Sequence, residues 1–86
     1  MWVVYFLRCN DNSLYCGITN DIEKRIKVHN MGKGAKYTRN KLPVKLVYIQ
    51  KVDNKSEALK LEYKLKKLTK RDKEKMIVSQ NYRIGK

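Results

Sequence analysis

Three side chains that could take part in phosphate chemistry fall within one short stretch of the chain. Tyr15, Arg25 and His29 supply a phenol, a guanidinium and an imidazole. Arg25 and His29 are four residues apart, so on a helix their side chains lie on the same face. A guanidinium binds phosphate oxygens, and a phenol or an imidazole can accept a proton. The three residues therefore predict a site for phosphoester chemistry.

The residues around these side chains predict a strand followed by a helix. Residues 14–18 have the composition of a short strand, and we expect Gly17 to let the backbone turn tightly after it. Asn20, with Glu23 three residues on, has the spacing of a helix N-cap and predicts a helix to about Asn30. Gly32 is expected to end that helix.

The remaining elements complete a small α+β domain. Residues 2–9 predict a strand buried on both faces, which carries Tyr5 and pairs with residues 14–18 as an antiparallel hairpin. The sequence leaves open whether Tyr5 and Tyr15 face the same side. Residues 44–52 predict a third strand, residues 56–68 a second helix, and Thr69 the start of a short third helix through residues 76–78. We expect one domain over residues 1–80, a three-stranded antiparallel sheet flanked by about three helices, and a loosely ordered tail at residues 81–86.

The composition points to a polyanion as the binding partner. The chain has 21 basic and 8 acidic residues and a net charge of +13, and nucleic acid is the commonest polyanion for a small basic domain. The basic residues are spread along the chain, so we expect no membrane partner. Cys9 and Cys16 are too few for a disulfide framework or a zinc site, which indicates reduced thiols and a cytoplasmic protein.

The segment at residues 32–39 is basic, rich in glycine and contains a tyrosine. Its cations Lys33, Lys36 and Arg39 can reach a phosphate, and Tyr37 can stack on a base. The alternative is a solvated connection without a binding role, and the residues alone favour the two interpretations equally.

One acidic residue lacks an ordinary structural explanation. Glu62 lies inside the apolar arc of the second predicted helix, near Ala58 and Leu65, whereas most other acids fall in turns or helix starts. A carboxylate on the buried side of a helix is costly unless a cation or a metal pairs with it. The alternative is an ordinary pair with Lys66 four residues on, which the periodicity by itself favours.

The order of these motifs resembles the GIY-YIG nuclease superfamily, in particular its small stand-alone bacterial YhbQ-like members. The resemblance covers about residues 1–78 and includes the Tyr-x-Gly of the second strand, the arginine and histidine of the next helix, the Gly-Lys-Gly-x-Lys-Tyr-Thr-Arg loop and the later glutamate. The first family motif reads Val3-Val4-Tyr5 here and the second reads Tyr15-Cys16-Gly17. Only the two tyrosines and the second glycine match those motifs.

The resemblance implies a metal-dependent endonuclease that hydrolyses DNA phosphodiester bonds. Glu62 would hold a single Mg²⁺ or Mn²⁺, and Arg25 would clamp the scissile phosphate. One of Tyr5 and Tyr15 would orient or deprotonate the attacking water, and His29 is a second candidate for that proton. Since tyrosine has an ordinary pKa of about 10, this role needs a nearby cation or metal. We expect no small-molecule cofactor.

Two other functions fit parts of the same sequence. A non-catalytic basic module that binds DNA or RNA on the same fold explains the net charge equally well, but it has no need of Glu62 in a basic groove. An interaction or assembly protein is supported only by Trp2 and the aromatic content, which core packing explains better.

Overall fold

The computed structural model describes the backbone of residues 1–84 and the side chains of residues 1–80. Along the chain it contains β1 (Trp2–Arg8), β2 (Leu14–Thr19), α1 (Ile22–Asn30), the 3-10 turn η1 (Lys36–Thr38), β3 (Lys45–Val52), α2 (Lys55–Lys66) and α3 (Lys70–Ile84). The strands form one sheet in the order β2-β1-β3, and both pairs are antiparallel. The expected α+β architecture, with three strands and three α-helices, is confirmed.

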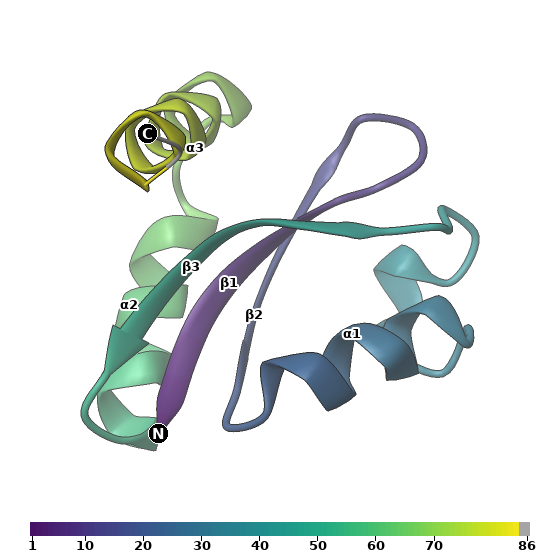
Figure 1. Ribbon diagram of the computed structural model, residues 1–86, viewed down its shortest axis with the longest axis horizontal. Helices are drawn as coiled ribbons and strands as arrows, with labels where there is room; N and C mark the ends of the chain where they lie inside the picture. The colour runs from purple at the N-terminus through teal and green to yellow at the C-terminus, as the bar shows by residue number, and fades with distance from the viewer. Residues whose placement is uncertain (85–86) are drawn as a thin grey trace.

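The sheet separates the helices into two layers, as Figure 1 shows. On one face, α1 packs over a cluster that contains Val3, Tyr5 and Leu7 of β1. On the other face, α2 and α3 pack over a cluster that contains Val4 and Phe6. The central strand β1 is therefore buried on both sides, as its continuous run of apolar residues predicts.

Two element boundaries differ from the expected ones. The N-cap of α1 is Asp21 and not Asn20, because the Asp21 carboxylate accepts a hydrogen bond from the backbone N–H of Lys24. The third helix is longer than expected and its backbone continues to Ile84. The side chains of residues 81–84 and all of residues 85–86 lie outside the described part, so the loosely ordered tail stays a prediction.

Helix α3 is attached to the sheet at two places. Near its start, Glu74 accepts two hydrogen bonds of 2.7 Å from the Arg8 guanidinium at the end of β1 and one of 2.9 Å from Lys70. Further along, the Gln80 side-chain amide pairs with the backbone N–H and carbonyl of Ile49 on the outer edge of β3. In the described part of the chain, no helix is both long enough and apolar enough to cross a membrane.

Candidate active site

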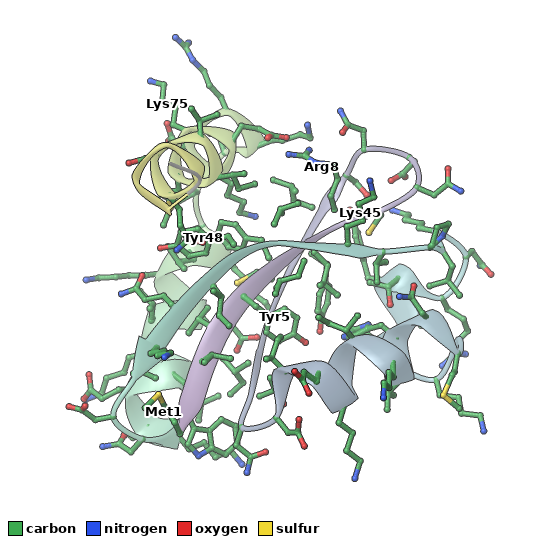
Figure 2. The ribbon with its side chains drawn as sticks, in the orientation of Figure 1. Met1, Tyr5, Arg8, Lys45, Tyr48 and Lys75 are labelled. Carbon is green, nitrogen blue, oxygen red and sulfur yellow. The ribbon has the colours of Figure 1, made fainter. Side chains whose placement is uncertain are left out.

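The strand register places Tyr5 and Tyr15 on the same face of the sheet. Tyr5 pairs with Gly17, and Leu7 pairs with Tyr15, so the two tyrosines are diagonal neighbours on adjacent strands. Their ring centroids are 6.3 Å apart. This face is the one that α1 covers, and Figure 2 shows the Tyr5 side chain between β1 and α1. The register thus answers the question that the sequence left open.

Gly17 lies in the middle of β2 and not at a turn, which corrects its expected role. A Cβ atom at this position would lie 2.7 Å from the Tyr5 hydroxyl oxygen and 2.9 Å from a ring carbon of Tyr15. The Tyr5 side chain is fully buried, so it has little room to move away. Gly17 is needed because it leaves space for the two phenols, which is a common reason for a glycine within a strand.

His29 is fully buried on α1 and is hydrogen-bonded through both ring nitrogens. Its Nε2 lies 3.2 Å from the Tyr5 hydroxyl, and its Nδ1 lies 2.9 Å from the Thr38 hydroxyl. Thr38 donates its single hydroxyl proton to the carbonyl of Ala35, at 3.0 Å, so it accepts from the Nδ1–H of His29. In a neutral imidazole the other nitrogen is then an acceptor, and Tyr5 donates to it. These bonds fix the orientation of both rings.

Burial keeps Tyr5 and His29 neutral at physiological pH. Removal from water raises the pKa of Tyr5 to about 12, although the hydrogen bond and the positive charge of Arg25 act in the opposite direction. Burial, followed by the charge of Arg25, lowers the pKa of His29. Arg25 and His29 thus both act on Tyr5, as their spacing on one helix predicts. The Arg25 guanidinium supplies the positive charge beside these two neutral groups.

The loop after α1 closes over His29. Gly34 packs against the imidazole so closely that an added Cβ would clash with His29 Nδ1, and Thr38 is fully buried beneath the loop. The residues expected to bind nucleic acid, in contrast, are exposed. They are Lys33, Lys36, Tyr37 and Arg39. The loop is therefore a structured cover for His29 with a basic outer surface. Thr38 belongs to the loop motif, but nothing in its residue type indicated that it would orient the histidine.

A cavity of about 390 Å³ opens at the outer edge of β2. Tyr15 contributes to its wall, and its ring lies in a stacked arrangement with Tyr37, with centroids 6.1 Å apart. The full lining is Leu14, Tyr15, Cys16, Tyr37, Lys66 and Lys73. The cavity is therefore bordered by phenols from β2 and the loop and by ammonium groups from α2 and α3. Sequence analysis did not single out Lys73, because one lysine in a lysine-rich helix carries no distinguishing pattern.

Glu62 lies near this cavity, on the α2 side of the sheet. Its carboxylate forms an ion pair of 3.3 Å with Lys66, and its side chain is 18% exposed. Burial raises the pKa of Cys16 to about 11, and the charge of Glu62 adds to that rise while Lys66 and Lys73 oppose it. These charges therefore lie around Cys16, the neighbour of Tyr15 on β2. The structure thus contains the Lys66 pair that the sequence offered as the alternative for Glu62.

The acidic groups of the described residues fit a metal only as a single carboxylate ligand. No three His, Cys, Asp or Glu side chains in that part of the chain are grouped as a metal site. A hydrated Mg²⁺ binds through one or two carboxylates and keeps several waters, so Glu62 alone is a sufficient protein ligand. Lys66 is half exposed, so it can turn away when a cation approaches the carboxylate.

These features define a class of small basic α+β domain, in which one sheet edge presents two tyrosines and a neighbouring helix presents an arginine. Residues 1–76 match the family model described as the GIY-YIG catalytic domain. The chain therefore belongs to the GIY-YIG family, which the motif order predicted. Family membership indicates a nuclease-type function.

Several relatives are similar over most of their length. UPF0213 protein CPE1444 of Clostridium perfringens is 56% identical over 78 residues, which are 91% of this chain and 84% of that protein. UPF0213 protein BLi00048/BL00536 of Bacillus licheniformis is 58% identical over 73 residues, 85% of this chain and 75% of that protein.

Two solution NMR structures share the fold. UPF0213 protein BH0048 from Bacillus halodurans is 46% identical with a TM-score of 0.58, and the match covers 91% of this chain and 84% of that one. Protein EF2693 from E. faecalis is 40% identical with a TM-score of 0.62, and the match covers 93% and 85% of the two chains.

Proposed function

We propose that this domain is a metal-dependent endonuclease that hydrolyses DNA phosphodiester bonds in the cavity beside β2. The observation that carries the proposal is the convergence of Tyr5, Arg25 and His29 next to Tyr15, which lines that cavity. These groups are held by neighbours that a simple binding surface does not require: Gly17 makes room for the phenols, and Thr38 orients the imidazole.

Tyr15 is the group that orients or deprotonates the attacking water. It is only partly buried and lines the cavity, so its hydroxyl can meet a solvent molecule. Tyr5 is fully buried and keeps its proton, which is donated to His29. Tyr5 and His29 are therefore positioning residues in this proposal: they hold the phenol layer and the guanidinium in place without touching the substrate.

Arg25 clamps the scissile phosphate. Its guanidinium presents several N–H donors in a plane that matches two phosphate oxygens, and it stays protonated throughout the reaction. Because Tyr5 holds it at the buried end of the site, the clamp is positioned before the substrate arrives. Charge that develops on the phosphate oxygens is then stabilised without reorganisation of the site.

Glu62 would hold the divalent cation, Mg²⁺ or Mn²⁺. When bound, such a cation acts as a Lewis acid on the phosphate and stabilises the leaving oxygen. The chain's own contribution is to release the carboxylate from Lys66. An exposed i, i+4 pair of this type is worth only about 0.3–0.5 kcal/mol, so the existing ion pair is a small obstacle to metal binding.

The substrate proposed is DNA because the domain is a strong polycation with a basic loop beside the site. Lys33, Lys36 and Arg39 extend from the loop that covers His29, so they can bind backbone phosphates on either side of the cavity. Tyr37 would contact a base at the cavity mouth, where it already lies beside Tyr15.

A non-catalytic nucleic-acid-binding module is the second candidate function. One specific observation favours it: the Glu62 carboxylate is paired with Lys66 in this structure. In such a module Glu62 would serve only to pair with that lysine, and the basic surface would act alone.

The deciding experiment incubates the protein with end-labelled single-stranded, duplex and branched DNA in Mg²⁺, Mn²⁺ or a chelator. An endonuclease cleaves at least one substrate in the presence of metal only. Glu62→Ala should abolish cleavage while binding in chelator stays level or becomes tighter, and Tyr15→Phe should abolish cleavage with binding retained. Absence of metal-dependent products from the wild-type protein on every substrate would leave the binding module as the function.

A further inference from the structure

Two lysines from the helices on the α2 face line the same cavity as Tyr15. Lys66 lies at the end of α2 and Lys73 lies in the second turn of α3, so neither belongs to the strand and helix that carry Tyr15 and Arg25. The cavity therefore has a phenol wall and an ammonium wall, which come from opposite faces of the sheet. The function proposed above assigns no role to the ammonium wall.

The immediate surroundings of these lysines differ from those of their neighbours. Lys70 is bound to Glu74 at 2.9 Å, and Lys60 is paired with Glu57 at 3.7 Å on another part of α2. Within the described residues, Lys73 makes no ion pair shorter than 4 Å, and Lys66 is paired with Glu62 alone. Lys73 thus places a charge in the cavity without a nearby acid, and Lys66 shares one acid that can be drawn away.

We propose that Lys66 and Lys73 form a second phosphate-binding site, which holds a backbone phosphate of the DNA next to the one gripped by Arg25. In this arrangement Glu62 controls the site: its carboxylate occupies Lys66 until a divalent cation, or removal of the carboxylate, sets the ammonium free. The proposal rests on the assignment of DNA as the substrate. It adds a specific set of contacts and couples DNA binding to the state of Glu62.

The charge arrangement supports a phosphate rather than another anion. Two ammonium groups on flexible stems make point contacts with a phosphate that need no planar geometry, whereas Arg25 offers a planar, preorganised fork. The phenols of Tyr15 and Tyr37 on the opposite wall fit the sugar and base of the same strand. A strand that runs along the β2 edge would therefore meet Arg25 from one face of the sheet and the two lysines from the other.

The test is a double-mutant cycle measured as DNA binding in chelator. A short fluorescein-labelled duplex is titrated with the wild-type protein and with Lys66→Met, Glu62→Gln and the double variant, in a series of KCl concentrations. Glu62→Gln should tighten binding about two- to fivefold, and this gain should vanish when Lys66 is also replaced. Lys73→Met should weaken binding about two- to fivefold and reduce the salt slope by about 1, as for one lost phosphate contact.

A matched pair on the same helix provides the control. Lys60→Met and Glu57→Gln change the charge in the same way outside the cavity, and they should leave binding and salt slope close to wild type. Circular dichroism confirms that every variant is folded.

Two results would overturn the proposal. One is that Lys66→Met and Lys73→Met keep the wild-type salt slope, and the other is that Glu62→Gln has the same effect with and without Lys66. Cleavage in Mg²⁺ or Mn²⁺ is scored separately. A wild-type protein that cleaves, with no coupling in the cycle, loses only the second phosphate site, whereas coupling without cleavage retains this site and removes the nuclease.

Discussion

The two faces of the sheet meet at the β2 edge, and they hold their polar groups in opposite ways. On the α1 face, Tyr5, His29 and Thr38 are fully buried and joined by directional hydrogen bonds. On the α2 face, Glu62 and Lys66 form an ion pair with a half-exposed ammonium. The first arrangement fixes geometry and resists change, whereas the second can exchange partners at low cost.

This difference indicates a division of labour within the site. Preorganised groups are useful where charge develops during a reaction, because they need not move. Exchangeable charges are useful where an ion or a phosphate must enter and leave. The comparison predicts that variants on the α1 face have large effects on both cleavage and stability, whereas variants on the α2 face act mainly on binding.

The largest effect is expected from Arg25→Ala. Loss of the preorganised guanidinium should reduce the single-turnover cleavage rate about 10²- to 10³-fold, while binding in chelator weakens only several-fold. Lys27→Ala removes the same charge from an exposed position of α1 and is the control. Single-turnover assays with labelled DNA measure both variants, and an equal loss in Lys27→Ala would show that Arg25 contributes only its net charge.

The next effect concerns stability on the buried face. His29→Ala removes a fully buried ring and leaves the Tyr5 hydroxyl and Thr38 Oγ1 without their partner, so we expect a loss of about 3 kcal/mol in the free energy of unfolding. Thr38→Val keeps the ring and should cost about 1–2 kcal/mol. Urea denaturation followed by circular dichroism gives both values. A loss below that of Thr38→Val in the His29 variant would contradict the hydrogen-bonded chain.

The dependence of stability on pH should separate buried from exposed groups. The folded pKa of His29 lies below its ordinary value of 6.5 because of burial and then Arg25. The unfolded chain therefore binds this proton more readily, so the stability is complete above pH 6.5 and falls as the pH drops below that value.

A second loss of stability with falling pH is expected from an ion pair. Hydrogen bonds from Arg8 and then Lys70 lower the pKa of Glu74 from 4.5 to about 2. This contribution is present above pH 4.5 and is lost as the pH falls toward 2. It should amount to about 1 kcal/mol because the pair is partly exposed. In urea titrations across this range, His29→Ala should lack the first loss and Glu74→Gln the second; an unchanged pH profile in either variant would contradict the assignment.

Much of the fold follows from local sequence patterns. The continuous apolar run of β1, the turn cluster at residues 10–13 and the helix signals each act over a few residues, so each can be recognised in isolation. The spacing of Arg25 and His29 likewise predicts that both reach the same neighbour, because helix geometry is fixed.

The parts that sequence analysis missed depend on contacts between distant elements. Gly17 was interpreted as a turn residue because glycine most often signals one, and only the strand register shows that it faces Tyr5. The role of Thr38 depends on the path of the loop over α1. The contribution of Lys73 to the cavity depends on where α3 crosses the sheet. None of these placements has a local signal.

The smallest predicted effect tests the exchangeable face directly. Glu62→Gln should change the free energy of unfolding by less than about 0.5 kcal/mol, since an i, i+4 pair with a half-exposed lysine contributes no more than that. Glu57→Gln, at the more exposed pair with Lys60, is the control, and urea denaturation measures both. A loss above about 1.5 kcal/mol in Glu62→Gln would mean that the carboxylate is a structural group whose partners are fixed. Neither a metal nor a phosphate could then draw the pair apart, and the α2 face would be as rigid as the α1 face.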